Sequence, residues 1–227
     1  MTDRYELRTI ARLYGDLPDK FGLPRQAGIV EELEGRIVFE PDFRNPDALR
    51  GLEGFSHLWL IWQFSEAVRE EWSPTVRPPR LGGNTRMGVF ATRSPFRPNA
   101  LGLSCVKLLG IETDPTLGPV LRVGGADLMS GTPIYDIKPY LPYADARPGA
   151  RAGFAPDPGA ALPVVFAPGE EEKLPAEKRA ALRGVLANDP RPRYQKDPER
   201  VYGLAFAGRN VKFRVEDGCV YVTEVEI

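Results

Sequence analysis

Five arginines lie close together between Val76 and Ser104, and no acidic residue accompanies them. The nearest carboxylates along the chain are those of Glu71 and Glu112, and Lys107 adds a further positive charge. A guanidinium stays charged at neutral pH and binds carboxylates or phosphates through parallel hydrogen bonds. We therefore expect an anionic ligand here, unless acids distant in the sequence pair with these side chains. The arginines are Arg77, Arg80, Arg86, Arg93 and Arg97.

Two other segments carry groups that could join this stretch at one site. Pro24-Arg25-Gln26 forms the donor-rich tip of a loop rich in glycine and proline. Asp127 stands in a turn that follows a short apolar strand. Together these segments could bind a small ligand that has a carboxylate and polar ring atoms. The residues alone support ligand or RNA binding and do not name a reaction.

The overall charge does not favour a nucleic-acid partner. The net charge is −1, so any such partner must be held by local patches. One patch lies between residues 191 and 214, where seven basic residues accompany two acidic ones. A solvated charged face and an RNA-backbone surface both explain it.

Several classes of site are excluded by what the chain lacks. With one histidine and two separated cysteines, we expect no metal site. His57 lies in an apolar strand, which favours a core or interface role over that of a base. The phosphate-binding P-loop, the dinucleotide-binding glycine motif and the G-x-S-x-G elbow are all missing. We see no signal peptide and no membrane-length apolar run, and therefore expect a cytoplasmic protein with no membrane partner.

The elements that must position these groups are mainly β-strands. Alternation predicts a first strand over Tyr5–Leu13 and a hairpin over 29–40 that turns at Glu34-Gly35. The apolar run Gly54–Phe64 predicts a strand buried on both faces, either in a barrel interior or across a subunit contact. Strands over Met87–Thr92 and Leu101–Ile111 flank a segment whose prolines cannot donate to a sheet, so that segment must leave the sheet as a loop.

A change in composition divides the chain. Residues 146–162 are rich in proline, glycine and alanine, as a linker is. We therefore predict a domain over residues 1–145 and a small α+β domain over 163–227. The second contains a helix over Pro175–Ala187 and three strands, the last two joined by a hairpin at Asp217-Gly218.

Several longer runs resemble the TrmO family, also called TsaA-like or YaeB-like. They are P-R-Q-A-G, G-F-S-H-L-W, R-P-P-R-L-G-G-N-T-R-M-G-V-F-A-T-R-S-P-F-R-P-N, D-L-M-S-G-T-P-I-Y-D-I-K-P-Y-L-P and, near the C-terminus, D-P-R-P-R-Y. The resemblance covers nearly the whole chain. It implies an S-adenosylmethionine-dependent tRNA methyltransferase that modifies N6 of threonylcarbamoyladenosine next to the anticodon. It also implies a single-sheet β-barrel, a small C-terminal domain and a homodimer.

The same resemblance implies a cofactor pocket. Its predicted members are Pro24, Arg25, Gln26, Ser65, Glu66, Arg93, Leu103, Asp127, Leu128, Met129 and Ser130. Ser65 stands where the family commonly has a histidine. In this pocket Arg25 or Arg93 would bind the cofactor carboxylate, and backbone carbonyls or an acid such as Asp127 would stabilise the positive sulfur. We assign no catalytic base; Tyr135 and Asp136 are the candidates.

We predict RNA contacts at five basic residues: Arg97, Arg191, Arg193, Lys196 and Lys212. Three further arginines are not assigned to one ligand and could contact RNA, the modified base or a dimer partner: Arg77, Arg80 and Arg86. Removal of residues 150–227 should then weaken tRNA binding more than cofactor binding. The alternatives are a non-catalytic RNA-binding β-barrel and a methyltransferase with a different acceptor.

Overall fold

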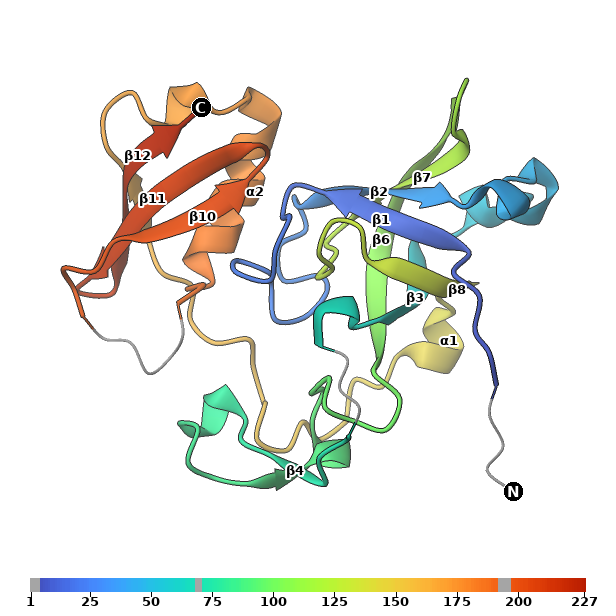
Figure 1. Cartoon of the computed structure of the whole chain (residues 1–227), viewed down its shortest axis with the longest axis horizontal. Helices are drawn as coiled ribbons and strands as arrows, with labels where there is room; N and C mark the ends of the chain where they lie inside the picture. Colours follow the sequence, from blue (N-terminus) through green and yellow to red (C-terminus); the bar gives the residue numbers. More distant parts are fainter. Residues whose placement is uncertain (1–4, 68–70, 192–196) are drawn as a thin grey trace.

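A closed barrel of six strands forms the first half of the protein (Figure 1). The computed structural model describes residues 5–67, 71–191 and 197–227. Around the barrel the strands follow the order β1-β2-β7-β6-β3-β8, and every neighbouring pair is antiparallel. The strands are β1 (Ala11–Gly15), β2 (Glu34–Phe39), β3 (His57–Gln63), β6 (Leu101–Asp114), β7 (Gly118–Gly124) and β8 (Pro133–Pro139). The prediction of a mainly β protein is confirmed.

Alternating side chains fill the barrel. In β3, Leu58, Leu60 and Trp62 are buried, whereas the residues between them are only half-buried. One face of this strand therefore lies in the barrel core and the other lies outside it. Burial of both faces in the barrel interior was wrong, and burial of the outer face across a subunit contact stays a prediction. A strand of a closed barrel needs only one apolar face, because the other faces away from the interior.

The N-terminal segment differs from its prediction in two ways. The first strand begins at Ala11 rather than at Tyr5. The hairpin expected at Glu34-Gly35 is absent, since both residues are already part of β2. Residues 16–33 instead form a long connection whose apolar side chains are buried in a different core. Alternation over 29–33 reflected that burial and not a strand.

The arginine-rich segment leaves the barrel, as its prolines predicted. It holds a two-stranded ladder of β4 (Thr75–Val76) and β5 (Met87–Gly88). The strand expected over Met87–Thr92 is shorter, because a 3-10 helix over Val89–Ala91 replaces its second half. The strand expected over Leu101–Ile111 is confirmed as β6, which is longer by three residues.

The C-terminal part is a helix packed on a four-stranded sheet. The sheet order is β10-β11-β12-β9, in which β9 is parallel to β12 and the other pairs are antiparallel. The elements are β9 (Val164–Phe166), α2 (Ala176–Ala187), β10 (Tyr202–Phe206), β11 (Arg209–Glu216) and β12 (Cys219–Glu226). The predicted helix and the hairpin turn at Asp217-Gly218 are confirmed.

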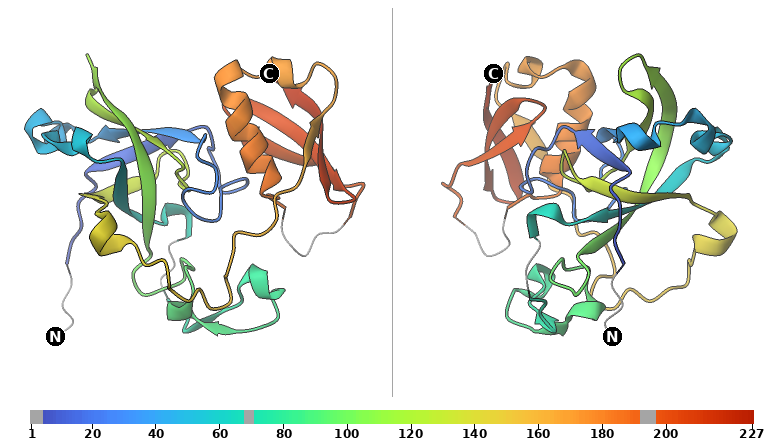
Figure 2. Two further views of the ribbon diagram at one scale, coloured as in Figure 1. Left: turned by 180° about the vertical axis from the view of Figure 1, so that it is seen from behind. Right: turned by 45° about the vertical axis from the view of Figure 1, so that its right-hand side comes forward.

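The connection 16–33 packs on this C-terminal part. Phe21 stacks on Tyr202 and Phe213, with ring centroids 6.4 and 6.3 Å apart. Lys178 of α2 forms an ion pair with Asp16 at 2.7 Å. Figures 1 and 2 show α2, drawn in orange, beside this connection, which is drawn in blue. The connection therefore belongs to the barrel by sequence and to the C-terminal core by packing.

The segment between the two parts has no regular structure. After the short helix α1 (Pro142–Asp145), residues 146–163 contain no helix or strand. They run past the arginine-rich segment (Figures 1 and 2), where Arg80 donates to the carbonyl of Asp157 and lies 3.9 Å from its carboxylate. Among the described residues, no helix has the length and apolar character needed to cross a membrane.

Candidate active site

A cavity of about 530 Å³ opens where β3 ends and β6 begins. Four segments line it: the tip of the connection 16–33, the residues that follow β3, the proline-broken loop, and the turn after β7. The lining residues are Lys20, Leu23, Pro24, Arg25, Gln26, Trp59, Trp62, Gln63, Phe64, Ser65, Glu66, Ala67, Arg93, Pro95, Arg97, Leu101, Gly102, Leu103, Asp127, Met129 and Thr132. Segments separated by more than 100 residues thus share one site.

Backbone contacts at Gly125 hold two of these segments together. Gly28 donates its N–H to the carbonyl of Gly125 at 2.8 Å, and Gly125 donates to the carbonyl of Leu33 at 3.0 Å. Gly125 has φ +74°, and a Cβ there would lie 3.2 Å from backbone atoms of Gly28. Only a residue without a side chain allows both this conformation and this approach. The pair of hydrogen bonds places the Pro24-Arg25-Gln26 tip beside Asp127.

Asp127 is one of two acids that line the cavity, with Glu66, and it is held by a hydrogen-bonded chain from the barrel core. The indole N–H of Trp62 donates to Ser104 Oγ at 2.9 Å, and that hydroxyl donates to Asp127 Oδ1 at 2.5 Å. Desolvation by burial raises the pKa of Asp127, against the lowering effects of the Ser104 hydroxyl, two backbone N–H groups and the charge of Arg93. Ser104 is buried, and sequence reasoning missed it, because a lone serine in an apolar strand gives no signal.

Guanidinium groups supply positive charge to the lining of the same cavity. Arg93 donates to Oε1 of Gln26, which links the proline-broken loop to the tip of the first connection. Arg97 also lines the cavity, and it donates to the carbonyls of Val89 and Thr92 at 3.3 and 3.0 Å. Arg97 thereby fixes the loop that carries Arg93. The cavity combines fixed positive groups with an acid and apolar walls.

The chain matches two family models. The tRNA-methyltransferase O N-terminal domain matches residues 13–146, and the TrmO C-terminal domain matches residues 159–227. The chain belongs to the TrmO family.

Relatives of this family match over almost the entire length. The chain is 42% identical to the tRNA (adenine(37)-N6)-methyltransferase of Escherichia coli K12, over 98% of both proteins. It is 50% identical to the enzyme of the same name from Eikenella corrodens, over 75% of this chain and 97% of that protein. A crystal structure of TrmO from Pseudomonas aeruginosa superposes with a TM-score of 0.83 at 30% identity, covering 99% of each chain.

The cavity contains nine of the eleven residues that the TrmO resemblance assigned to the cofactor. They are Pro24, Arg25, Gln26, Ser65, Glu66, Arg93, Leu103, Asp127 and Met129. The other two lie elsewhere. Leu128 is buried in the barrel core, and Ser130 accepts a hydrogen bond from the N–H of Gly15 at 3.3 Å. Alternate residues of the turn point to opposite sides, so a run of four consecutive residues cannot all face one cavity.

The candidate bases lie outside this TrmO cavity. Tyr135 donates to Gln63 Oε1, and desolvation by burial raises its pKa. Asp136 forms an ion pair with Lys138 at 2.8 Å. His57 lies beside Ser56, with 2.9 Å between its Nδ1 and the serine hydroxyl, and is absent from the lining. In the described part of the chain, no group of three or more His, Cys, Asp or Glu side chains could hold a metal ion.

Two of the four residues predicted to contact RNA in the C-terminal part have acidic partners among the described residues. Arg191 forms an ion pair with Asp189 at 2.8 Å. Lys212 forms ion pairs with both Glu224 and Glu226 across the β11–β12 ladder. Arg193 and Lys196 lie outside the described residues. Intramolecular acids therefore pair with both of the predicted RNA contacts that the structure describes in this part.

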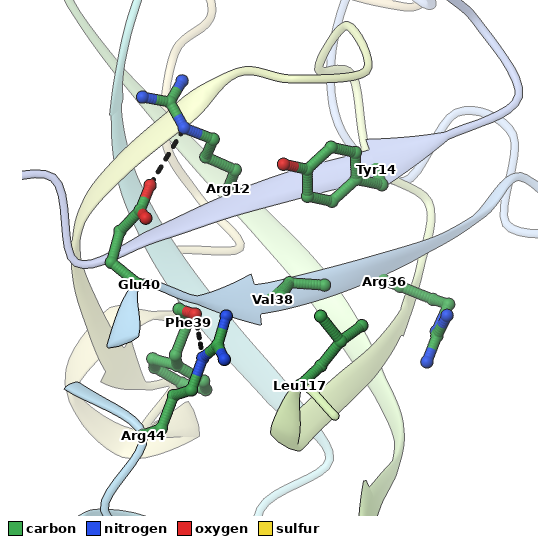
Figure 3. A pocket seen from close by; sticks show the side chains of 8 residues that line it. All are labelled: Arg12, Tyr14, Arg36, Val38, Phe39, Glu40, Arg44 and Leu117. Atoms are coloured by element: carbon green, nitrogen blue, oxygen red, sulfur yellow. Dashed lines mark hydrogen bonds and ion pairs between the residues drawn. The ribbon is translucent and has the colours of Figure 1, made fainter. Parts of the chain in front are cut away.

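A smaller cavity of about 320 Å³ lies on the outer face of β1 and β2 (Figure 3). Three arginines line it, but each is engaged by the protein. Arg12 pairs with Glu40 at 3.0 Å, Arg44 donates to the carbonyl of Phe39 at 2.9 Å, and Arg36 lies 3.4 Å from Asp114. These contacts explain the three arginines of this cavity without a ligand.

Proposed function

We propose that this protein transfers a methyl group from S-adenosylmethionine to N6 of threonylcarbamoyladenosine at position 37 of tRNA, next to the anticodon. The relatives from Escherichia coli and Eikenella corrodens are tRNA (adenine(37)-N6)-methyltransferases by name. The observation that carries the proposal is the 530 Å³ cavity, which brings together Arg25, Arg93 and Asp127 from three separate loops.

The side chains of this cavity fit the chemistry of the cofactor. Arg25 and Arg93 are the groups to bind its carboxylate, since a guanidinium recognises a carboxylate through paired hydrogen bonds. Asp127 and Glu66 are the acids that stabilise its ammonium and sulfonium charges. Leu23 and Leu103 offer apolar surface for the adenine ring. When bound, the cofactor supplies an electrophilic methyl carbon attached to a positively charged sulfur.

Positioning is the main contribution of the protein to the transfer. The bond between N6 and the methyl carbon forms as the bond between that carbon and sulfur breaks, and N6 releases its proton to solvent. Such a displacement needs the two reacting atoms in line and in contact, and holding them so lowers the barrier substantially. The hydrogen bonds between Trp62, Ser104 and Asp127 fix the acid on which the cofactor is oriented.

Nucleoside mass spectrometry tests the proposed reaction. Purified protein is incubated with S-adenosylmethionine and tRNA that carries threonylcarbamoyladenosine, and the digested nucleosides are measured. We expect a product heavier by one methyl group, and tRNA without the precursor should give none. Methylation of a different nucleoside would support a different acceptor, and cofactor binding with no methylation would support the non-catalytic RNA-binding barrel.

We further propose that the two parts of the chain divide substrate binding between them. Residues 1–145 hold the cofactor, residues 163–227 contribute to tRNA binding, and residues 146–162 connect them in a cytoplasmic enzyme. The two family models support a boundary in this region, since one ends at residue 146 and the other begins at 159. Crosslinking of bound tRNA, followed by peptide mapping, should identify contacts in both parts.

A homodimer is also part of this proposal. Large apolar side chains are exposed near the cavity and on the arginine-rich segment: Leu103 is 56% exposed, Phe90 74% and Trp72 48%. Trp72 and Phe90 stack on each other, with ring centroids 6.1 Å apart, and such contiguous exposed apolar surface favours a protein interface. Light scattering coupled to size-exclusion chromatography should give twice the chain mass, and replacement of Phe90 by serine should shift the mass toward the monomer.

A further inference from the structure

A second cavity, of about 760 Å³, lies beside the cofactor cavity and shares Arg93 and Pro95 with it. The arginine-rich segment provides most of its walls, and Phe154 of the linking segment provides one more. Its lining residues are Ser73, Thr75, Val76, Arg77, Pro78, Pro79, Arg86, Thr92, Arg93, Ser94, Pro95, Phe96 and Phe154. A molecule in the first cavity and a group in the second would therefore be neighbours.

The two cavities differ in charge. The cofactor cavity is lined by the carboxylates of Glu66 and Asp127 together with four basic side chains, so it has groups of both signs. The second cavity is lined by three arginines and by no acid in the described part of the chain. An anionic group is therefore favoured in the second cavity, whereas the first also offers carboxylates to a cationic group. This division matches a transfer between a sulfonium donor and an acceptor that carries a negative charge.

The β4–β5 ladder brings Arg77 and Arg86 together. Val76 pairs with Met87 in the antiparallel register, so Arg77 and Arg86 continue from this pair on opposite strands. Like charges at such positions repel one another and destabilise a ladder. Both side chains are exposed, and neither has a hydrogen bond or ion pair within the described residues. The juxtaposition has no structural benefit without an anion.

Other arginines of the same segment have intramolecular partners. Arg80 binds Asp157 of the linking segment, and Arg97 binds the carbonyls of Val89 and Thr92. Arg93, the third arginine of the second cavity, donates to Gln26, so the absence of a partner within the described residues is particular to Arg77 and Arg86. It is not a general property of the segment.

We propose that Arg77 and Arg86 bind the carboxylate of the threonylcarbamoyl group of the acceptor nucleoside. This inference rests on the function proposed above, because it assigns the anion of that substrate to a subsite. The substituent is attached to N6, which must face the cofactor cavity, so its carboxylate extends into the adjoining space. Paired guanidinium groups are suited to a carboxylate. Phe96 and Phe154 offer aromatic surface for its apolar part or for a base.

Binding measurements with two RNAs test the subsite. One is an anticodon stem-loop that carries threonylcarbamoyladenosine, and the other is the same RNA with the threonyl carboxylate converted to a neutral methylamide. Affinities are measured with S-adenosylhomocysteine present, so that no methyl transfer occurs. We expect the wild type to bind the carboxylate form about tenfold or more tightly than the amide, as for a charge-assisted contact.

The double variant Arg77→Gln, Arg86→Gln should lose this preference while it keeps its affinity for S-adenosylhomocysteine. Arg77→Lys, Arg86→Lys should keep part of the preference, because the charges remain. Arg50→Gln is the matched control: its side chain is 80% exposed, pairs with Asp47 and lies in another loop, so the preference should be unchanged. Thermal melting of each variant confirms that it is folded.

Two results would overturn the inference. If the double variant binds both RNAs more weakly by the same factor and keeps its preference for the carboxylate, the arginines contact RNA phosphates instead. If the wild type methylates the stem-loop but shows no preference, the carboxylate is not recognised in this cavity. A wild-type protein that binds the cofactor but does not methylate the stem-loop would refute the proposed function itself.

Discussion

The packing of Val30 predicts that the C-terminal part controls cofactor binding at a distance. Val30 is 1% exposed and lies in the connection that carries Pro24-Arg25-Gln26. It packs on α2 so closely that a Cβ added to Gly184 would lie 2.6 Å from its Cγ1. Val30→Ala removes two methyl groups, at about 0.8 kcal/mol each, and leaves a small cavity, for a total of about 2 kcal/mol.

This loss weakens the docking of the connection on α2, and the docked form is the one that lines the cavity. Because each 1.4 kcal/mol is a factor of ten, the affinity for S-adenosylmethionine should fall by at most about 25-fold. Isothermal titration calorimetry measures the affinity, and urea unfolding measures the stability. The control is Val222→Ala, which makes the same change at a side chain 1% exposed in β12. β12 lies two positions along the sheet from β10, whose Tyr202 stacks on Phe21 of the connection.

The two variants should lose similar stability, and only Val30→Ala should lose cofactor affinity. Equal affinities in the two variants would refute the reasoning.

The same packing revises what the sequence alone predicted for a truncation. Removal of residues 150–227 exposes Leu17, Val30 and Leu33, so cofactor binding should be lost together with tRNA binding. A truncated protein that binds the cofactor normally would show that the connection folds without the C-terminal core.

Three further substitutions test the cavity itself. Arg93→Ala should lower cofactor affinity by roughly tenfold, with little change in melting temperature because the side chain is exposed; a large loss of stability would indicate a structural role. Burial raises the pKa of Asp127, and the hydroxyl of Ser104 lowers it. Ser104→Ala removes that hydroxyl and should raise the pKa further. Cofactor affinity, lost as pH falls through this pKa, should therefore be lost at a higher pH than in the wild type, and an unchanged pH profile would contradict the role of Asp127. Gly102→Ala should destabilise the barrel by about 1–3 kcal/mol in chemical denaturation, since a Cβ would lie 2.2 Å from the indole of Trp62; wild-type stability would show that the indole can move.

Local chemistry determined much of this protein from its sequence. The prolines of the arginine-rich segment lack amide hydrogens, so the segment had to leave the sheet. The helix over Ala176–Ala187 and the turn at Asp217-Gly218 follow from side-chain periodicity and turn chemistry over a few residues. The long motifs also revealed the family, and with it nine of the 21 residues that line the cavity.

The tertiary structure decided what depends on residues far apart in the chain. It closed the barrel with β8, which pairs with both β1 and β3. The sequence did not reveal this strand, which begins and ends with a proline. It placed Ser104 on Asp127, 23 residues away, and Trp62 on Ser104, 42 residues away. It also separated the paired arginines from the unpaired ones. Burial and counter-charges are supplied by distant segments, so only the folded chain reveals that Arg77 and Arg86 have no hydrogen bond or ion pair within the described residues.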